Sequence, residues 1–536
     1  MAKSEDAAEE YFAGGHALPW YIVAGSLMLT NLSTEQLVGL NGAVFADGCL
    51  AGICWETFAV FAMCITASVF LPLYMKSGVA TTSGFLGTRF DAATRTGVAS
   101  VFLVFYTLGL CPVVLYSGAL GMQSIFPWHV PLWCWSTGIG LVGACYAIFG
   151  GLKAVAVSDC INGIGLVIGG LWVLLAGLGR IGGLSALFEE PALLRPLVLR
   201  SEVFDEATGR RLEGTPSVPC HVLLTGLVLQ NIYYWSTNQL IVQRALAARS
   251  LAEGQKGVLF AAAMKVVSFS VLCLPGAMSV LMVRNGIAVD GVPFEVHKAD
   301  RAYPLFVRAV MPKWSLGFFA AVLLGSVLST FNSALNSAAT LFGLEIYKIH
   351  IDPEASDKRV VKVATMFGIL VSLASFVIAP QLASVASIFD WVQRAKTLAS
   401  LPIITVFVVG VATVAPDAFA AKVGFAVGAV SYGAGQLLQG PHFLHVFFAC
   451  FVLSLCAVYM ATYSELCRAR FGKAAVEGAA AEEPGEESAL DLTPWPARPW
   501  VSWALVALVV FLTAALQAGS LSLFVAFCAG WAAVTL

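Results

Sequence analysis

Long apolar stretches recur along almost the whole chain, and short polar segments separate them. About 20 apolar residues in helical form cross the roughly 30 Å hydrocarbon core of a bilayer. The pattern therefore predicts an all-α membrane protein with about thirteen spans. The predicted spans are 17–43, 50–75, 97–123, 130–150, 155–180, 217–246, 256–284, 315–347, 360–380, 383–412, 417–436, 441–466 and 498–535.

Polar residues interrupt the first and the sixth of these spans, at corresponding places in two sets of five. Residues 30–36 break the first apolar run, and residues 231–239 break the sixth. Paired discontinuous helices are typical of inverted-repeat transporters, whose binding site lies near the middle of the membrane. The exposed helix ends offer carbonyl groups for a cation and N–H groups for a polar solute.

Composition agrees with a membrane protein and argues against several other classes. Hydrophobic residues make up 59 % of the chain and charged residues 12 %, and the mean hydropathy is +0.83. A net charge of −2 without a basic stripe predicts no nucleic-acid partner. The cysteines that we placed fall within apolar runs and the histidines are scattered, so we expect no metal cluster. P-loop, HExxH and GxSxG motifs are absent, so we expect no ATP site, no enzyme activity and no organic cofactor.

Charge in the short connections predicts the orientation. Their lysines and arginines all lie on one side of the membrane if the spans alternate, and the positive-inside rule makes that side the cytoplasm. The N-terminus then lies on the inner side of the cell (cytoplasmic) membrane and the C-terminus on the outer side. We expect the protein to be embedded in the lipid bilayer and to need no obligatory protein partner. The predicted segments are a cytoplasmic leader (1–16), a first repeat (17–180), an extracellular loop (181–216), a second repeat (217–412), two additional spans (413–473), a cytoplasmic linker (474–497) and a last span (498–536).

Three hydroxyl side chains, Ser326, Ser329 and Thr330, lie on a span that is otherwise apolar or small. Two of them are adjacent and the third lies one helical turn earlier, which supplies oxygen ligands suited to a hard cation. Alternatively, small hydroxyl residues simply let neighbouring helices approach closely.

Several segments resemble the sodium/solute symporter family, and particularly its sodium/glucose and sodium/galactose cotransporters. They are 24–39, 55–56 with 70–72, 150–159, 231–235 with 238–239 and 243–244, and 336–337 with 346–348. The resemblance implies the leucine-transporter fold, with two inverted five-helix repeats plus about three extra C-terminal helices. The family usually carries an extra helix before the first broken one. This chain starts too late to contain it, so its start is truncated or misassigned, or that helix is dispensable.

The resemblance also implies a sodium (Na⁺) site, in which a hydroxyl pair joins backbone carbonyls of the first broken helix. The implied ligands are Ser329 and Thr330 and the carbonyls of Leu29 and Leu32, with Ser326 alongside. Asp159 matches a transient ligand on the sodium exit route. Alternatively, Asp159 caps the start of the fifth span, since an aspartate there accepts hydrogen bonds from free backbone N–H groups.

A sugar site is implied as well. Glu56 matches a carboxylate that hydrogen-bonds substrate hydroxyls, which suits a polyol; alternatively, it is an interfacial residue near the outer end of its span. Tyr234 matches an aromatic ring that stacks on the sugar and closes the inner gate. Lys265 matches a sugar-contacting amine, and alternatively pairs with a carboxylate in a structural role. The candidate solute ligands are Asn31, Gln36, Glu56, Asn231, Tyr234, Trp235, Lys265 and Gln393.

Residues 389–396 depart from the sugar cotransporters. The segment resembles them through Asp390 and Gln393 but carries cations, Arg394 and Lys396, where they carry neutral residues. Two cations near the pocket would favour an anionic solute such as a sugar acid. Alternatively, Asp390 pairs with Arg394 at i,i+4 on a water-facing surface and the pocket is unaltered. We favour the second interpretation because the remaining sugar-contact set is intact.

The combined prediction is a sodium-coupled symporter that imports a sugar, such as galactose or glucose, by alternating access. One alternative is a sodium-coupled importer of a sugar acid or of another anionic or polyol solute. The other is a transporter-like membrane sensor of a solute. The linker 474–497 leads only to another span, which argues against the sensor.

Overall fold

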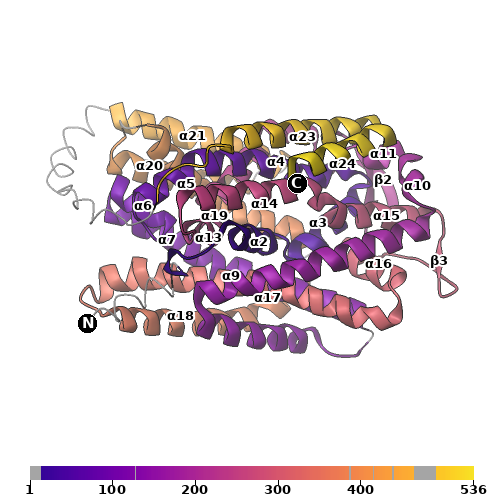
Figure 1. The fold of residues 1–536 in the computed structure, drawn as a ribbon, viewed down its shortest axis with the longest axis horizontal. Coiled ribbons are helices and arrows are strands. Elements are labelled where there is room, and N and C mark those ends of the chain that lie inside the picture. Colours follow the sequence, from indigo (N-terminus) through magenta and orange to yellow (C-terminus); the bar gives the residue numbers. More distant parts are fainter. Residues whose placement is uncertain are drawn as a thin grey trace.

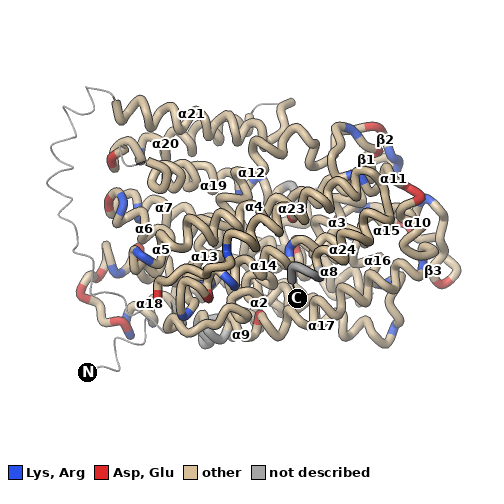
Figure 2. Tube along the Cα trace, turned by 45° about the horizontal axis from the view of Figure 1, so that its top comes forward, with Lys and Arg blue, Asp and Glu red and all other residues tan. Residues whose placement is uncertain are grey.

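The computed structural model describes residues 12, 14–126, 128–384, 388–413, 416–437, 440–463 and 491–535, except for the side chains of 146–151, 153–154, 388–390 and 532–535. Figure 1 shows a bundle whose long helices run roughly along the longest dimension of the molecule. Charged residues gather at the two ends of the bundle, and fewer lie between them (Figure 2). Helices that cross a bilayer show this distribution, because charge is costly in hydrocarbon.

The first repeat begins after a short 3-10 turn, η1 (Gly14–His16). Its helices are α2 (Trp20–Asn31), α3 (Thr34–Asp47), η2 (Leu50–Gly52), α4 (Ile53–Ile65), α5 (Leu71–Lys76), α6 (Thr82–Arg89), α7 (Ala92–Val104), α8 (Cys111–Ile125) and α9 (Leu132–Ile181). Two π-helical turns, η3 (Thr66–Phe70) and η4 (Phe105–Leu110), join α4 to α5 and α7 to α8. Each joined pair forms one continuous span, as the sequence predicts for 50–75 and 97–123.

The second repeat follows the same plan. Its helices are η5 (Cys220–Val222), η6 (Leu223–Leu227), α12 (Val228–Ile232), η7 (Tyr233–Thr237), α13 (Gln239–Leu246), α14 (Leu251–Leu272), α15 (Leu274–Arg284), η8 (Ala299–Arg301), α16 (Ala302–Val310), η9 (Lys313–Ser315), α17 (Leu316–Leu341), η10 (Phe342–Ile351), α18 (Asp357–Ile378), η11 (Ala379–Ser384) and α19 (Ile388–Ala412). Of these, η6, η7 and η10 are π-helical.

Both predicted helix interruptions are present. Leu32 and Ser33 separate α2 from α3, and neither has helical backbone angles. Asn238 separates η7 from α13, and its side chain accepts a hydrogen bond from the backbone N–H of Leu240 at 3.1 Å. Asparagine and serine side chains compete with the helical backbone for hydrogen bonds, so they are common where a helix stops and restarts.

Helix α9 covers two predicted spans, 130–150 and 155–180, and its contacts show that it folds back on itself. A straight helix of 50 residues would be about 75 Å long, far more than a bilayer needs. Along its first half, Gly143 lies against Phe331 of α17, and the earlier Trp135 lines a cavity with Leu324. Along the second half, the contacts run the opposite way, from Asp159 beside Ser329 to Trp172 beside Trp314. The two halves are therefore antiparallel, as two spans require.

The last span predicted over 498–535 is wrong, because this segment contains two helices. Beyond the repeats the helices are α20 (Ala418–Gly435), α21 (Phe443–Tyr463), α23 (Arg498–Ala518) and α24 (Leu521–Thr535). Gly519 ends α23 with a φ of +61°, which favours glycine, and α24 packs against α23 (Figure 1). Within the described residues, nine helices are long and apolar enough to cross a membrane. This number is below the prediction because several spans consist of shorter pieces.

The predicted extracellular loop 181–216 is folded. It contains α10 (Leu184–Phe188), α11 (Pro191–Leu194) and the antiparallel strands β1 (Ser201–Asp205) and β2 (Arg210–Gly214). Arg211 donates a hydrogen bond to the carbonyl of Phe45 at 2.7 Å, and Asp47 accepts one from the backbone of Ser217 at 2.8 Å. These contacts fasten the loop and the residue that follows it to the end of α3. A smaller hairpin, β3 (Ala288–Val289) with β4 (Val292–Pro293), follows α15.

Candidate functional site

The hydroxyl groups predicted to bind sodium meet the end of α2. The Ser326 hydroxyl donates to the carbonyl of Leu32 at 2.6 Å, and the Thr330 hydroxyl donates to the carbonyl of Thr30 at 3.3 Å. These carbonyls lie where α2 stops, so the interrupted helix gives them no full set of backbone partners. Buried hydroxyl and carbonyl oxygens from α17 and α2 therefore converge, which is the ligand chemistry of a hard cation.

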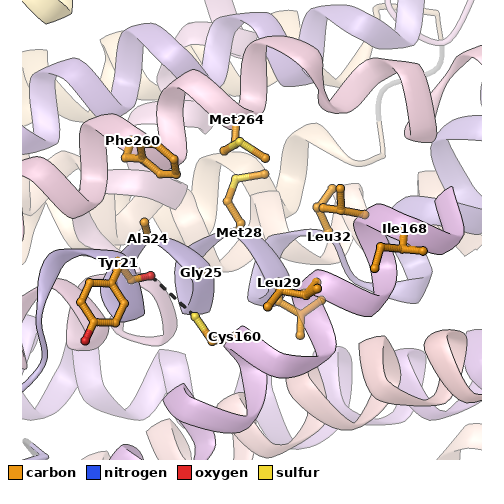
Figure 3. Close-up of a pocket in the computed structure, with 13 residues that line it drawn as sticks. Tyr21, Ala24, Gly25, Met28, Leu29, Leu32, Cys160, Ile168, Phe260 and Met264 are labelled. Carbon is orange, nitrogen blue, oxygen red and sulfur yellow. Dashed lines mark hydrogen bonds between the residues drawn. The ribbon is translucent and has the colours of Figure 1, made fainter. Parts of the chain in front are cut away.

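Leu29 packs against α9, close to Gly163. Its side chain, with those of Met28 and Leu32, lines an apolar cavity of about 270 Å³ between α2, α9 and α14. Figure 3 shows that Tyr21 and Cys160 edge the same cavity, where Cys160 donates to the Tyr21 carbonyl. The second carbonyl that contacts α17 is that of Thr30, which the sequence prediction missed.

Asp159 lies inside α9 and is 1 % exposed, so the alternative that it caps a helix start is wrong. Its carboxylate accepts hydrogen bonds from Ser329 at 2.6 Å and from Ser26 at 2.7 Å. The guanidinium of Arg244, which is equally buried, lies 3.6 Å away. Arg244 also donates to Ser26 at 2.8 Å and to Ser333. The candidate sodium ligand Ser329 therefore belongs to a hydrogen-bonded network around a buried ion pair.

Sequence reasoning missed the network's other hydroxyls, although a signal was present. Ser26 and Thr30 are four residues apart on α2, and Ser329 and Ser333 are four residues apart on α17. Residues at this spacing share one face of a helix. The sequence therefore showed a row of hydroxyl groups on each of two apolar helices. It did not show that the two helices are in contact.

Glu56 lies in the first turn of α4 and is 2 % exposed, so its carboxylate is buried among protein side chains. Its carboxylate forms an ion pair with Lys265 and accepts a hydrogen bond from Ser268 at 2.6 Å. The structural pairing suggested for Lys265 is therefore present. The pair joins α4 to α14 in the interior of the bundle.

An aromatic pair from η7 lies beside this ion pair. The Lys265 ammonium is 5.6 Å from the ring centroid of Trp235, and the ring of Tyr234 meets that of Trp235 edge-on, with centroids 5.3 Å apart. The Lys396 ammonium lies 4.1 Å from the ring centroid of Tyr234. The two aromatic side chains thus lie between two buried lysines.

Several buried polar oxygens on α2, α3 and α19 have no hydrogen-bond partner among the described residues. They are Asn31 Oδ1, Glu35 Oε2, Gln36 Oε1 and Gln393 Oε1. Each is a hydrogen-bond acceptor, and leaving a buried polar group unpaired costs about 1–3 kcal/mol. Asn31 and Glu35 both interact with Tyr234, which places them at the aromatic pair. The sequence prediction missed Glu35.

The structure gives the remaining candidates, Asn231, Arg394 and Lys396, different surroundings. Asn231 donates its amide to the carbonyl of Leu227 at 3.1 Å, within its own helix. Arg394 is exposed and its guanidinium lies 5.4 Å from the ring centroid of Phe443, whereas Lys396 is 9 % exposed. Lys396 therefore lies beside the candidate solute ligand Tyr234. The interpretation in which Asp390 pairs with Arg394 and the pocket is unaltered stays a prediction. The side chain of Asp390 lies outside the described residues.

Comparisons with known proteins show which family the chain belongs to. The chain is 38 % identical over 458 residues to the uncharacterized symporter YidK of Escherichia coli (strain K12), covering 83 % of this chain and 77 % of YidK. It is 31 % identical over 416 residues to a sodium/glucose cotransporter of Vibrio parahaemolyticus, covering 76 % and 75 %. It is 28 % identical over 425 residues to the human sodium/myo-inositol cotransporter 2, covering 76 % and 62 %.

Among solved structures, a Na⁺-coupled sialic acid symporter in an outward-open state superposes with a TM-score of 0.72 at 19 % identity, covering 86 % of this chain and 93 % of the other. This similarity shows the leucine-transporter fold. The sequence model of the Sodium:solute symporter family matches residues 11–428. This multi-pass membrane protein therefore belongs to the sodium:solute symporter family.

Proposed function

We propose that this protein is a sodium-coupled importer of a sugar, with galactose and glucose as the first candidates. The observation that carries the proposal is the set of acceptor oxygens on Asn31, Glu35, Gln36 and Gln393 that lack partners in the described protein. A polyhydroxyl solute supplies several hydroxyl donors at once, and it presents C–H faces to the ring of Tyr234. Two relatives, the sodium/glucose and sodium/myo-inositol cotransporters, are named for solutes of this chemistry.

Sodium and solute are coupled, in this proposal, through the break between α2 and α3. The carbonyl of Leu32 at the break contacts Ser326 of α17, and Glu35 and Gln36 begin the next helix only a few residues later. A sodium ion held between α2 and α17 would fix the break and with it the first turn of α3. Solute and ion then favour the same conformation, which is the thermodynamic requirement for symport.

The driving force is sufficient without ATP. A tenfold sodium gradient provides about 1.4 kcal/mol, and a membrane potential of 100 mV adds about 2.3 kcal/mol for each charge. One sodium ion per solute would then support an accumulation of about 500-fold.

Reconstituted uptake tests the proposal. Purified protein in liposomes should take up galactose or glucose when the outside buffer contains sodium, and should not do so when potassium replaces it. Uptake into liposomes that contain only this protein would also exclude a pure sensor. Equal uptake in both buffers would contradict sodium coupling, and sodium-dependent uptake confined to solutes without hydroxyl groups would contradict a sugar.

A further inference from the structure

Lys396 is a buried cation with no carboxylate against it. The residue is 9 % exposed, and no acidic oxygen of the described side chains lies within 4.0 Å of its ammonium group. The ammonium instead lies over the ring of Tyr234, 4.1 Å from the centroid. A cation over an aromatic face gains less free energy than the removal of an ammonium group from water costs.

The other charges around Tyr234 do not neutralise Lys396 directly. Glu56 already forms an ion pair with Lys265 and accepts a hydrogen bond from Ser268. Glu35 interacts electrostatically with Lys396, but it forms no ion pair with it within 4.0 Å, and its Oε2 has no partner among the described residues. The groups around Tyr234 therefore include one direct ion pair, Glu56 with Lys265, and two opposite charges, Glu35 and Lys396, that form none within 4.0 Å.

We infer that Lys396 selects a solute that carries a carboxylate, so that the sugar of the proposed function is a sugar acid such as a hexuronate. This inference rests on the proposed function, because it assigns the solute to the same pocket. A carboxylate on the ammonium group would form a charge-assisted hydrogen bond in a site of low dielectric constant. The hydroxyl groups of the same molecule would donate hydrogen bonds to the unpartnered oxygens of Gln36 and Gln393.

Glu35 sets an upper limit on the charge of this solute. Its carboxylate accepts hydrogen bonds from hydroxyl groups, and its charge repels a second anionic group on the solute. The expected substrate is therefore a polyol with a single carboxylate.

Arg394 supplies a matched control. It lies on the same helix two residues before Lys396, but it is exposed and packs over Phe443 of α21. A substitution of Arg394 removes the same charge from α19 without changing the surroundings of Tyr234.

The experiment compares solutes that differ only in the carboxylate. Sodium-dependent binding of galacturonate and galactose, and of glucuronate and glucose, is measured on purified protein by calorimetry or thermal shift. A second set of solutes, small hydroxy acids and their amides, tests carboxylates that are not attached to a sugar. We expect the wild-type protein to bind the acid of each sugar pair more tightly. Lys396→Gln should weaken acid binding by about 10- to 100-fold and leave neutral-sugar binding nearly unchanged.

Further variants separate specificity from a structural role. Lys396→Arg should retain the preference for acids, and Arg394→Gln should retain both affinities. If Lys396 simply balances Glu35, Lys396→Gln should weaken acid and neutral sugars by the same factor, and this result would overturn the inference.

The outcomes distinguish this inference from the proposed function. Tighter binding of neutral hexoses by the wild-type protein would overturn the inference and support the proposed function. Binding confined to acids that are not sugars would overturn the proposed function, and the loss of that binding in Lys396→Gln would support the role of Lys396. Binding of no member of the panel would overturn both.

Discussion

The hydroxyl cluster between α2 and α17 and the pocket around Tyr234 are neighbours, but they differ in how their polar groups are satisfied. In the cluster, Ser326, Ser329 and Thr330 all donate to oxygens of the protein. In the pocket, Gln36 and Gln393 have buried oxygens without a partner among the described residues. The comparison teaches that the protein itself satisfies the polar groups of the proposed ion site, whereas a solute would complete those of the proposed solute site. Substitutions in the two regions should therefore have different consequences.

The largest effect is expected in the cluster, from Asp159→Ala. This change leaves the guanidinium of Arg244 buried without its carboxylate, and breaking a buried ion pair costs about 3–5 kcal/mol. Unfolding of the detergent-solubilised protein measures the loss. The double variant Asp159→Ala/Arg244→Met should recover more than half of it, because no uncompensated charge remains. A single variant as stable as the wild type would show that the network is not preorganised by this pair.

In the pocket, Gln393→Ala should reduce uptake of the true solute by about 100-fold, because a solute hydroxyl loses its buried acceptor. The protein should still fold, with a loss in the free energy of unfolding of about 1–3 kcal/mol, because Gln393 is buried and its truncation leaves a cavity. Gln381→Ala, at an exposed glutamine beyond α18, is the matched control and should leave uptake unchanged. Normal uptake by Gln393→Ala would remove α19 from the pocket.

Thr330→Ala should raise the sodium concentration for half-maximal uptake by about tenfold, because one oxygen ligand is lost from the site. The order of preference among solutes should not change. Thr405→Ala removes a hydroxyl that donates within its own helix, to the carbonyl of Leu401 at 2.9 Å, and serves as the control. An unchanged sodium dependence would contradict the assignment of the ion site.

The smallest effect is expected from Tyr234→Phe, which keeps the ring beneath Lys396 and removes only the hydroxyl group. Solute affinity should fall by about threefold, in line with the loss of one neutral hydrogen bond. Tyr234→Ala removes the ring as well and should lower affinity much further. Equal affinities of the two variants would mean that the ring contributes nothing to recognition.

The sequence alone determined the class of the protein and the position of both helix breaks. Apolar runs of helical length identified the spans, because hydrocarbon admits few other structures. The polar segments at 30–36 and 231–239 marked the breaks, because irregular polar backbone is tolerated at membrane depth only where it is buried in protein or lines a cavity. The contacts of α9 with α17 agree with the two spans predicted there, because they run in opposite directions along its two halves. The family model matches residues 11–428, and this range includes the segments that resemble the sodium/solute symporters.

The tertiary structure decided which polar groups face each other. The sequence left Asp159 equally suited to capping a helix, and left Glu56 and Lys265 with several roles; the structure buries all three in ion pairs. The two cations Arg394 and Lys396 are two residues apart on α19, so they point to different sides of the helix. The packing of η7 against α19 places Lys396 over Tyr234, whereas Arg394 is exposed. Helix periodicity is a local property of the chain, whereas the partner that covers each face is set by contacts between residues far apart in sequence.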